Sequence, residues 1–183
     1  MPIEKTAVLP LGDDFPVAVQ ITIHAHDIGY LGTLQVGLDR PYRLPIPLKE
    51  RDVEDLNGEI QRALEQTATA FESSANTMAQ QEALAELAKI GRFAYLSIFP
   101  SENIRIALAR ALQIGTTIQV TSDAFFIPWE LLYLGESGAS VNLNDFWGMR
   151  YVVSRAAGGF RRRTARVAGF TNSAPARGLG NLQ

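Results

Sequence analysis

The feature that most constrains the fold of this chain is a change in the period of its apolar residues. Residues 15–27 and 30–38 alternate apolar and polar positions, whereas residues 53–112 repeat apolar positions every three or four residues. Alternation is typical of half-buried strands, and the longer period is typical of helices. Alternation returns at residues 116–122. The sequence therefore predicts strands, then helices, then strands again, in an α/β protein.

Turn and breaker residues divide these stretches into elements. Asp27 and Gly29 supply turn chemistry, which predicts an antiparallel hairpin at about 16–38. Three prolines make residues 40–47 an extended edge or connection and not a central strand. Asp52 is expected to be the N-cap of the first helix. We expect helices at about 53–72, 80–99 and 102–113, and strands near 117–122 and 148–154. The last strand is expected in the core, because Tyr151-Val152-Val153 is apolar on both faces.

Length and composition bound the organisation of the chain. Its 183 residues are 46% hydrophobic and 20% charged, as in an ordinary soluble protein with a sizeable core. We expect three regions: a hairpin region at 1–50, a helical region at 51–115, and an α/β region with an arginine-rich end at 116–183. The start lacks the features of a secretory signal, and no apolar run approaches the roughly 20 residues that span a bilayer. Cysteine is absent. These observations fit a cytoplasmic protein with no membrane partner.

The charge is unevenly distributed. Seven arginines and no acidic residues follow Asp145, so that end carries +7; because the whole chain carries −2, the first 145 residues carry −9. A basic end on an acidic body indicates either contact with nucleic acid or contact with an acidic protein surface.

The stretch Ala124–Gly135 places Pro128, Trp129 and Glu130 in an otherwise apolar run. Pro128 suits the first turn of a short helix, which we expect to extend over Trp129–Tyr133. Glu130 would then lie near the helix N-terminus, where a carboxylate is favoured. On physical grounds alone, we interpret this segment as a structural element that holds the fold together through a buried tryptophan.

Three segments carry a family resemblance. They are LAELAKIGRFAYLSIFP at Leu84–Pro100, the acidic-apolar-Pro-Trp-Glu-Leu-Leu signature at Asp123–Leu132, and GMRYVVSR at Gly148–Arg155. Together they resemble the front of a CHAT domain, the caspase-like cysteine peptidase module of bacteria. ARVAGFTNSAP, at Ala165–Pro175, looks like the first core strand of the caspase-like sheet. The resemblance implies that residues 116–183 begin such a sheet, which is incomplete here. The signature residues are Pro128, Trp129, Glu130, Leu131, Leu132, Arg150 and Arg155.

The chain departs from the family at the catalytic residues. In such peptidases a histidine and then a cysteine follow the first core strand, and neither is present here beyond that segment. A cysteine peptidase needs a thiolate beside an imidazole, so we predict no catalytic residues in this chain. We also expect no cofactor, and no metal site is assigned. The resemblance implies a non-catalytic N-terminal part or subunit of a bacterial regulatory or defence peptidase. Its expected partners are the remainder of the peptidase and a regulatory protein.

Two other features allow more specific functional interpretations. His24 and His26 share one strand face, and with Asp27 they could bind a metal; otherwise they are polar residues at a strand end. The second feature is the arginine cluster Arg161, Arg162, Arg163 and Arg166. It could be a processing site, a partner-contact loop, a solvated connector or, with less support, a nucleic-acid contact. Two alternatives to a peptidase part therefore stay open: a non-enzymatic protein-binding adaptor and a basic-tailed nucleic-acid-associated protein.

Overall fold

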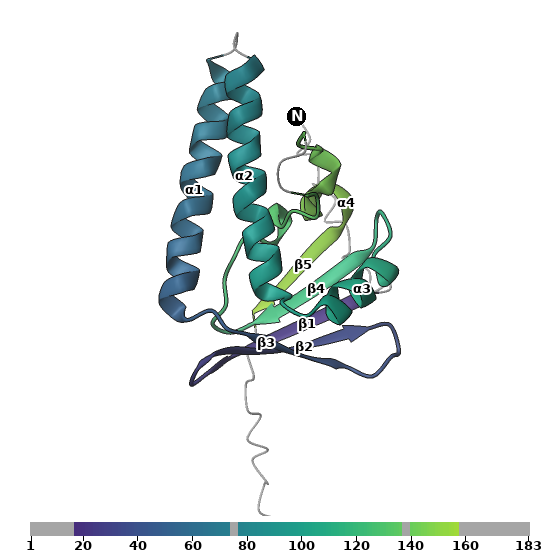
Figure 1. Ribbon diagram of the computed structural model, residues 1–183. Coiled ribbons are helices and arrows are strands. Elements are labelled where there is room, and N and C mark those ends of the chain that lie inside the picture. The colour runs from purple at the N-terminus through teal and green to yellow at the C-terminus, as the bar shows by residue number, and fades with distance from the viewer. Residues whose placement is uncertain (1–16, 74–76, 137–139, 158–183) are drawn as a thin grey trace, which may run out of the picture.

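The computed structural model describes residues 17–73, 77–136 and 140–157. They form one mixed five-stranded sheet in the order β3-β2-β1-β4-β5, with helices packed against it (Figure 1). This arrangement confirms the predicted α/β class. The strands are β1 (Val17–His26), β2 (Gly29–Val36), β3 (Tyr42–Ile46), β4 (Thr117–Ser122) and β5 (Val152–Ala157). The helices are α1 (Glu50–Glu72), α2 (Thr77–Ile98), α3 (Glu102–Ala111) and α4 (Trp147–Arg150), with 3₁₀ turns η1 (Trp129–Leu131) and η2 (Leu143–Asp145).

Strands from both ends of the described chain meet in this sheet. β1 and β2 pair antiparallel around the turn before Gly29, which confirms the hairpin, and β3 continues the antiparallel order as an edge strand. Gly29 has a φ of +139°, and a Cβ there would lie 2.8 Å from the Ile46 carbonyl oxygen, so the turn requires glycine. β4 pairs parallel with β1, and β5 pairs parallel with β4. The N-terminal hairpin and the β4–β5 pair therefore share one core.

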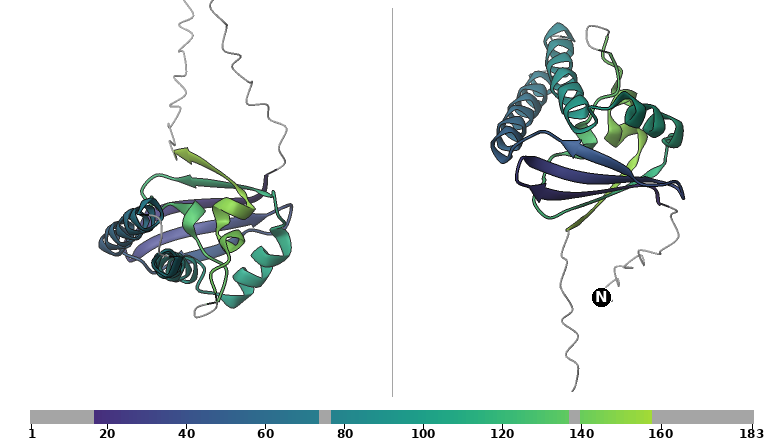
Figure 2. Two further views of the ribbon diagram at one scale, coloured as in Figure 1. Left: turned by 90° about the horizontal axis from the view of Figure 1, so that it is seen from above. Right: turned by 60° about the horizontal axis from the view of Figure 1, so that its bottom comes forward.

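The two faces of the sheet differ in chemistry. Figure 2 shows the helices on one side of the sheet. The covered face carries buried aliphatic side chains: Val19, Ile21, Ile23, Leu34, Leu44, Ile46, Ile118 and Val120. The other face carries mainly polar side chains, among them Gln20, Thr22, Thr33, Gln119, Thr121 and Ser154. The described strands thus form a two-layer α/β arrangement whose uncovered face suits water.

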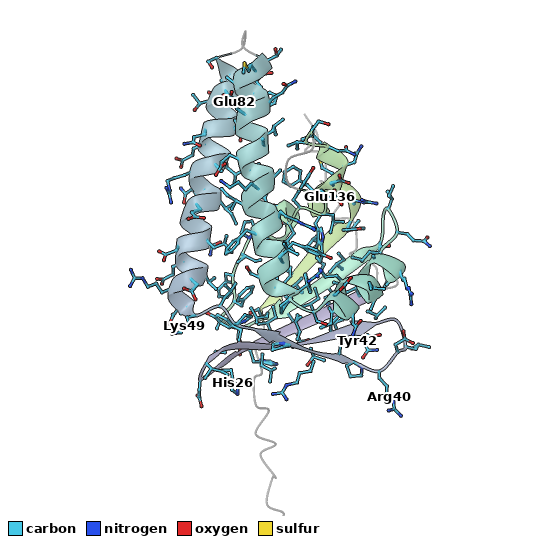
Figure 3. The ribbon with its side chains drawn as sticks, viewed as in Figure 1. His26, Arg40, Tyr42, Lys49, Glu82 and Glu136 are labelled. Carbon is cyan, nitrogen blue, oxygen red and sulfur yellow. The ribbon has the colours of Figure 1, made fainter. Side chains whose placement is uncertain are left out.

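The long helices α1 and α2 form an antiparallel hairpin. α1 begins three residues earlier than predicted. Lys49 is its N-cap, and Asp52 is not: it lies at N3, where Oδ2 accepts a hydrogen bond from the Lys49 N–H at 2.8 Å. The predicted apolar face is buried at Val53, Leu56, Ile60 and Ala63. The helical period of the sequence places Leu64 and Phe71 on the same face, but both are exposed, because the outer half of the hairpin, near Glu82, extends away from the sheet (Figures 1 and 3).

The last predicted strand begins later than expected and lies at an edge. Residues 148–150 belong to the helical turn α4, which is closed by the Tyr151 N–H donating to the Trp147 carbonyl at 2.8 Å. The strand starts at Val152, whose side chain is 57% exposed, so the prediction of a core strand is wrong for the described residues. The apolar run Tyr151-Val152-Val153 gave the wrong prediction because Tyr151 packs into the aromatic core, whereas Val152 faces the uncovered side of the sheet.

Candidate functional site

The Pro128–Leu132 segment follows β4 and crosses the covered face of the sheet. Its helix is shorter than predicted: η1 is a single 3₁₀ turn, in which the Leu131 N–H donates to the Pro128 carbonyl at 3.0 Å. Pro128 precedes this turn as its cap and is not inside it. The predicted burial of Trp129 is confirmed, with 1% of the residue exposed, and Leu132 is equally buried.

Trp129 belongs to an aromatic cluster centred on Trp147. The ring centroids of the two tryptophans are 6.2 Å apart, and Trp147 stacks on Phe99 of α2 at 5.8 Å. Tyr95 and Tyr151 pack edge-on against Trp147, and burial raises the pKa of both phenols, so they stay neutral. The Trp147 indole N–H has no hydrogen-bond partner among the described residues. The cluster connects α2, α4 and η1 through apolar contacts.

Sequence reasoning did not single out Trp147. Its signal was the aromatic pair Phe146-Trp147 directly after a polar loop. In the structure, the Trp147 N–H donates to the Leu132 carbonyl at 2.9 Å, and the Leu134 N–H donates to the Asp145 carbonyl at 2.9 Å. These bonds, with the bridge between Tyr133 and Phe146, hold residues 132–134 against residues 145–147. The backbone thereby fixes both tryptophans in one place.

Helix α2 approaches the same segment closely. A Cβ added at Gly91 would overlap the Leu131 carbonyl oxygen and lie 3.2 Å from the Tyr133 Cβ. One residue on, the Arg92 Nη1 donates to the Leu134 carbonyl at 3.0 Å. Helix α2 is therefore in direct contact with the Pro128–Leu132 segment. These two elements carry the LAELAKIGRF and PWELL sequences.

Glu130 and Arg155 connect the same segment to β5. The Arg155 Nη2 pairs with the Glu130 Oε2, and the two side chains are 50% and 41% exposed. A Cβ at Gly148 would lie 2.8 Å from the Glu130 Cβ, so the close passage of α4 past Glu130 also requires a glycine. Arg150 pairs with Asp145 at 3.3 Å. Glu130 and Asp145 thus each face an arginine instead of forming a carboxylate pair for acid–base chemistry.

We expect the Glu130–Arg155 pair to contribute about 1 kcal/mol or less to stability, because half-exposed ion pairs are screened by water and salt. A double-mutant cycle with Glu130→Ala and Arg155→Ala, followed by urea unfolding, measures the coupling. The more exposed pair Arg51–Asp55, 3.8 Å apart, is the matched control, with coupling near zero. A coupling that exceeds about 3 kcal/mol and persists in 1 M salt would contradict this assignment, since only desolvated pairs behave in that way.

The remaining sequence candidates lie elsewhere. The His24 Nδ1 lies 3.5 Å from the Asp123 Oδ2 at the carboxyl ends of β1 and β4. His26 lies at the end of the β1–β2 hairpin (Figure 3). Within residues 17–73, 77–136 and 140–157, no group of three or more potential ligands is arranged to hold a metal ion. Arg161, Arg162, Arg163 and Arg166 fall outside the described residues.

Comparison with known proteins gave no match: no protein-family model, no curated protein and no solved structure is significantly similar to this chain. Among the described helices, none combines the length and the apolar character needed to cross a membrane.

Proposed function

We infer that this chain is a non-catalytic N-terminal part or subunit of a caspase-like cysteine peptidase of the CHAT type, acting in the cytoplasm in a bacterial regulatory or defence system. In this proposal it supplies one end of the peptidase sheet and a surface for a regulatory protein. The proposal starts from the three sequence segments that resemble the family.

The observation that carries the proposal is that these three segments form one contact cluster. The second segment contacts both of the others directly: Leu131 lies against Gly91 of Leu84–Pro100, and Glu130 pairs with Arg155 of Gly148–Arg155. The aromatic rings of all three segments meet at Trp147, the residue just before the third segment. Segments that are far apart in sequence and also meet in space are expected if they form a single functional unit. The cluster lies beside two parallel strands, β4 and β5, which is the strand arrangement that a larger α/β sheet would extend.

A groove between α1 and α2 is the surface where we expect the regulator to bind. It has a volume of about 700 Å³, and its lining combines the apolar side chains of Ile90, Phe93 and Leu96 with charged side chains of both signs: Glu59, Arg62, Glu86, Lys89 and Arg92. Phe93 is 56% exposed. An exposed surface that combines large apolar side chains with charged ones is typical of a protein-binding surface. The same groove would serve the alternative function, a non-enzymatic adaptor.

The proposal is tested by expressing this chain together with the polypeptide encoded downstream of it. We expect a stable complex that hydrolyses peptides and loses activity when the cysteine of the partner is replaced by alanine. A complex without peptidase activity would favour the adaptor. Failure to bind the downstream polypeptide, in the presence or absence of other cellular proteins, would overturn the proposal.

We also expect the isolated chain to have no peptidase activity, because it contains no cysteine that could act as a nucleophile. The purified chain, incubated with a broad peptide library, should match a buffer control. Activity that survives repurification and disappears in a His24→Ala variant would show that the chain carries its own catalytic group.

A further inference from the structure

A small recess lies at the carboxyl ends of the parallel strands β4 and β5. It has a volume of about 130 Å³ and lies between these strand ends and the loop that follows β4. Four of its lining side chains are apolar and at most 3% exposed: Val120, Phe125, Ile127 and Trp129. In open α/β sheets, ligands bind outside the carboxyl ends of the strands. The position of the recess and its apolar walls are therefore those of a site for a small apolar group.

Ser122, the last residue of β4, adds a hydrogen-bond donor to the lining of the recess. The residue is only 6% exposed. Its Oγ accepts hydrogen bonds from the Phe125 N–H at 2.8 Å and from the Ala124 N–H at 3.4 Å. Within the part of the chain that the structure describes, no group accepts the hydroxyl proton. A hydroxyl can donate one hydrogen bond as well as accept two, so Ser122 still has a donor to offer to a molecule in the recess.

Arg155 gives the recess a positive charge. Among the described residues that line it, Arg155 alone carries a charged side chain, and Glu130 is not part of the lining. The guanidinium pairs with Glu130 through Nη2 only, so most of its five N–H donors remain available. Because the side chain is 50% exposed, those donors lie where the recess meets solvent. A ligand that enters the recess therefore meets a positive charge.

The two polar groups, Ser122 and Arg155, lie on the same face of neighbouring strands. Arg155 is directly opposite Val120, two residues before Ser122, so the two donors are diagonal neighbours across the β4–β5 pair. A long side chain such as that of arginine reaches across such a diagonal. A single carboxylate can therefore accept hydrogen bonds from both groups.

We propose that this recess binds a small aromatic carboxylate, whose ring contacts the apolar walls and whose carboxylate accepts hydrogen bonds from Arg155 and Ser122. An apolar cavity of about 150 Å³ holds one benzene ring, so the volume of this recess suits a single ring. The aromatic walls favour an aromatic ring through edge-on and offset contacts, and the guanidinium selects a negative charge. The proposal goes beyond the proposed peptidase function and does not depend on it, because it uses only groups of this chain.

Benzoate, with one ring and one carboxylate, is the probe for a titration of the full chain. Nuclear magnetic resonance follows the Trp129 indole N–H and the backbone amides of residues 120–129, and we expect a saturable change in these signals. Arg155→Gln should weaken the binding of benzoate about threefold to fivefold, the upper scale for a half-exposed ion pair. Glu130→Gln should strengthen it about twofold to fivefold, because the competing carboxylate is removed.

Arg150→Gln is the matched control. Arg150 also pairs with a carboxylate, that of Asp145, but it does not line the recess, so the affinity for benzoate should not change. Benzyl alcohol has the same ring without the charge, and its affinity should not respond to Arg155→Gln. The gain expected for Glu130→Gln cannot arise from a loss of folding, so the test does not depend on the stability of Arg155→Gln. Signals that change without saturation, or only outside the recess, would overturn the proposal. Equal affinities for benzoate in the wild-type chain, Arg155→Gln and Glu130→Gln would overturn it as well.

Discussion

Replacing Trp129 with alanine is expected to lower the free energy of unfolding by about 3–5 kcal/mol, the usual scale for removing a buried large aromatic side chain. Trp129 is only 1% exposed and packs against Trp147 and Phe125, with ring centroids 6.2 and 6.1 Å away. The segment around it is held by backbone hydrogen bonds to residues 145–147, so it cannot easily move to fill the space. The cost should therefore include a cavity term as well as the lost burial.

Urea unfolding measures this effect, with the fluorescence of Trp147 as the probe in the variant and circular dichroism as the probe in both proteins. Phe126→Ala is the matched control, because Phe126 lies in the same loop but is 63% exposed. We expect the control to lower stability by about 1 kcal/mol or less. Equal losses of stability in the two variants would contradict the conclusion that the buried packing of Trp129 in η1 stabilises the fold.

Much of the fold follows from periodicity. The alternation in residues 17–23 assigned Val19, Ile21 and Ile23 to the buried face, and all three are fully buried. The steps of three and four in α1 selected Val53, Leu56 and Ile60 in the same way. Periodicity reports which side of an element is apolar, and it succeeds where that side meets a core. It failed for Leu64 and Phe71, because the helical period continues past the point where the sheet ends.

The candidate site was harder to predict than the fold. Trp129 was identified because a proline and a tryptophan stand out in an apolar run. Trp147, Gly91 and the Glu130–Arg155 pair depend on how α2, η1 and β5 are placed in three dimensions. No local pattern encodes that placement. The start of β5 was predicted too early for the same reason: residues 147–150 form a helical turn closed by a backbone hydrogen bond from Tyr151 to Trp147, and no local pattern marks that turn.

Gly91 provides a second test of the contact between α2 and the Pro128–Leu132 segment. We expect Gly91→Ala to lower the free energy of unfolding by about 3 kcal/mol, at the upper end of the usual cost of overpacking. The added methyl group would overlap the Leu131 carbonyl oxygen, and backbone can move less easily than a flexible side chain.

The matched control for Gly91→Ala is Gly58→Ala, in the middle of α1, where an added Cβ has no neighbour within 4 Å. Alanine is the better helix former, so this variant should raise stability by about 0.5–1 kcal/mol. The two substitutions make the same chemical change in two helices of one protein, and their opposite signs isolate the contact with Leu131. Both variants are compared by urea unfolding under identical conditions. If Gly91→Ala also stabilises the protein, α2 does not approach η1 closely, and the contact cluster that supports the proposed function is lost.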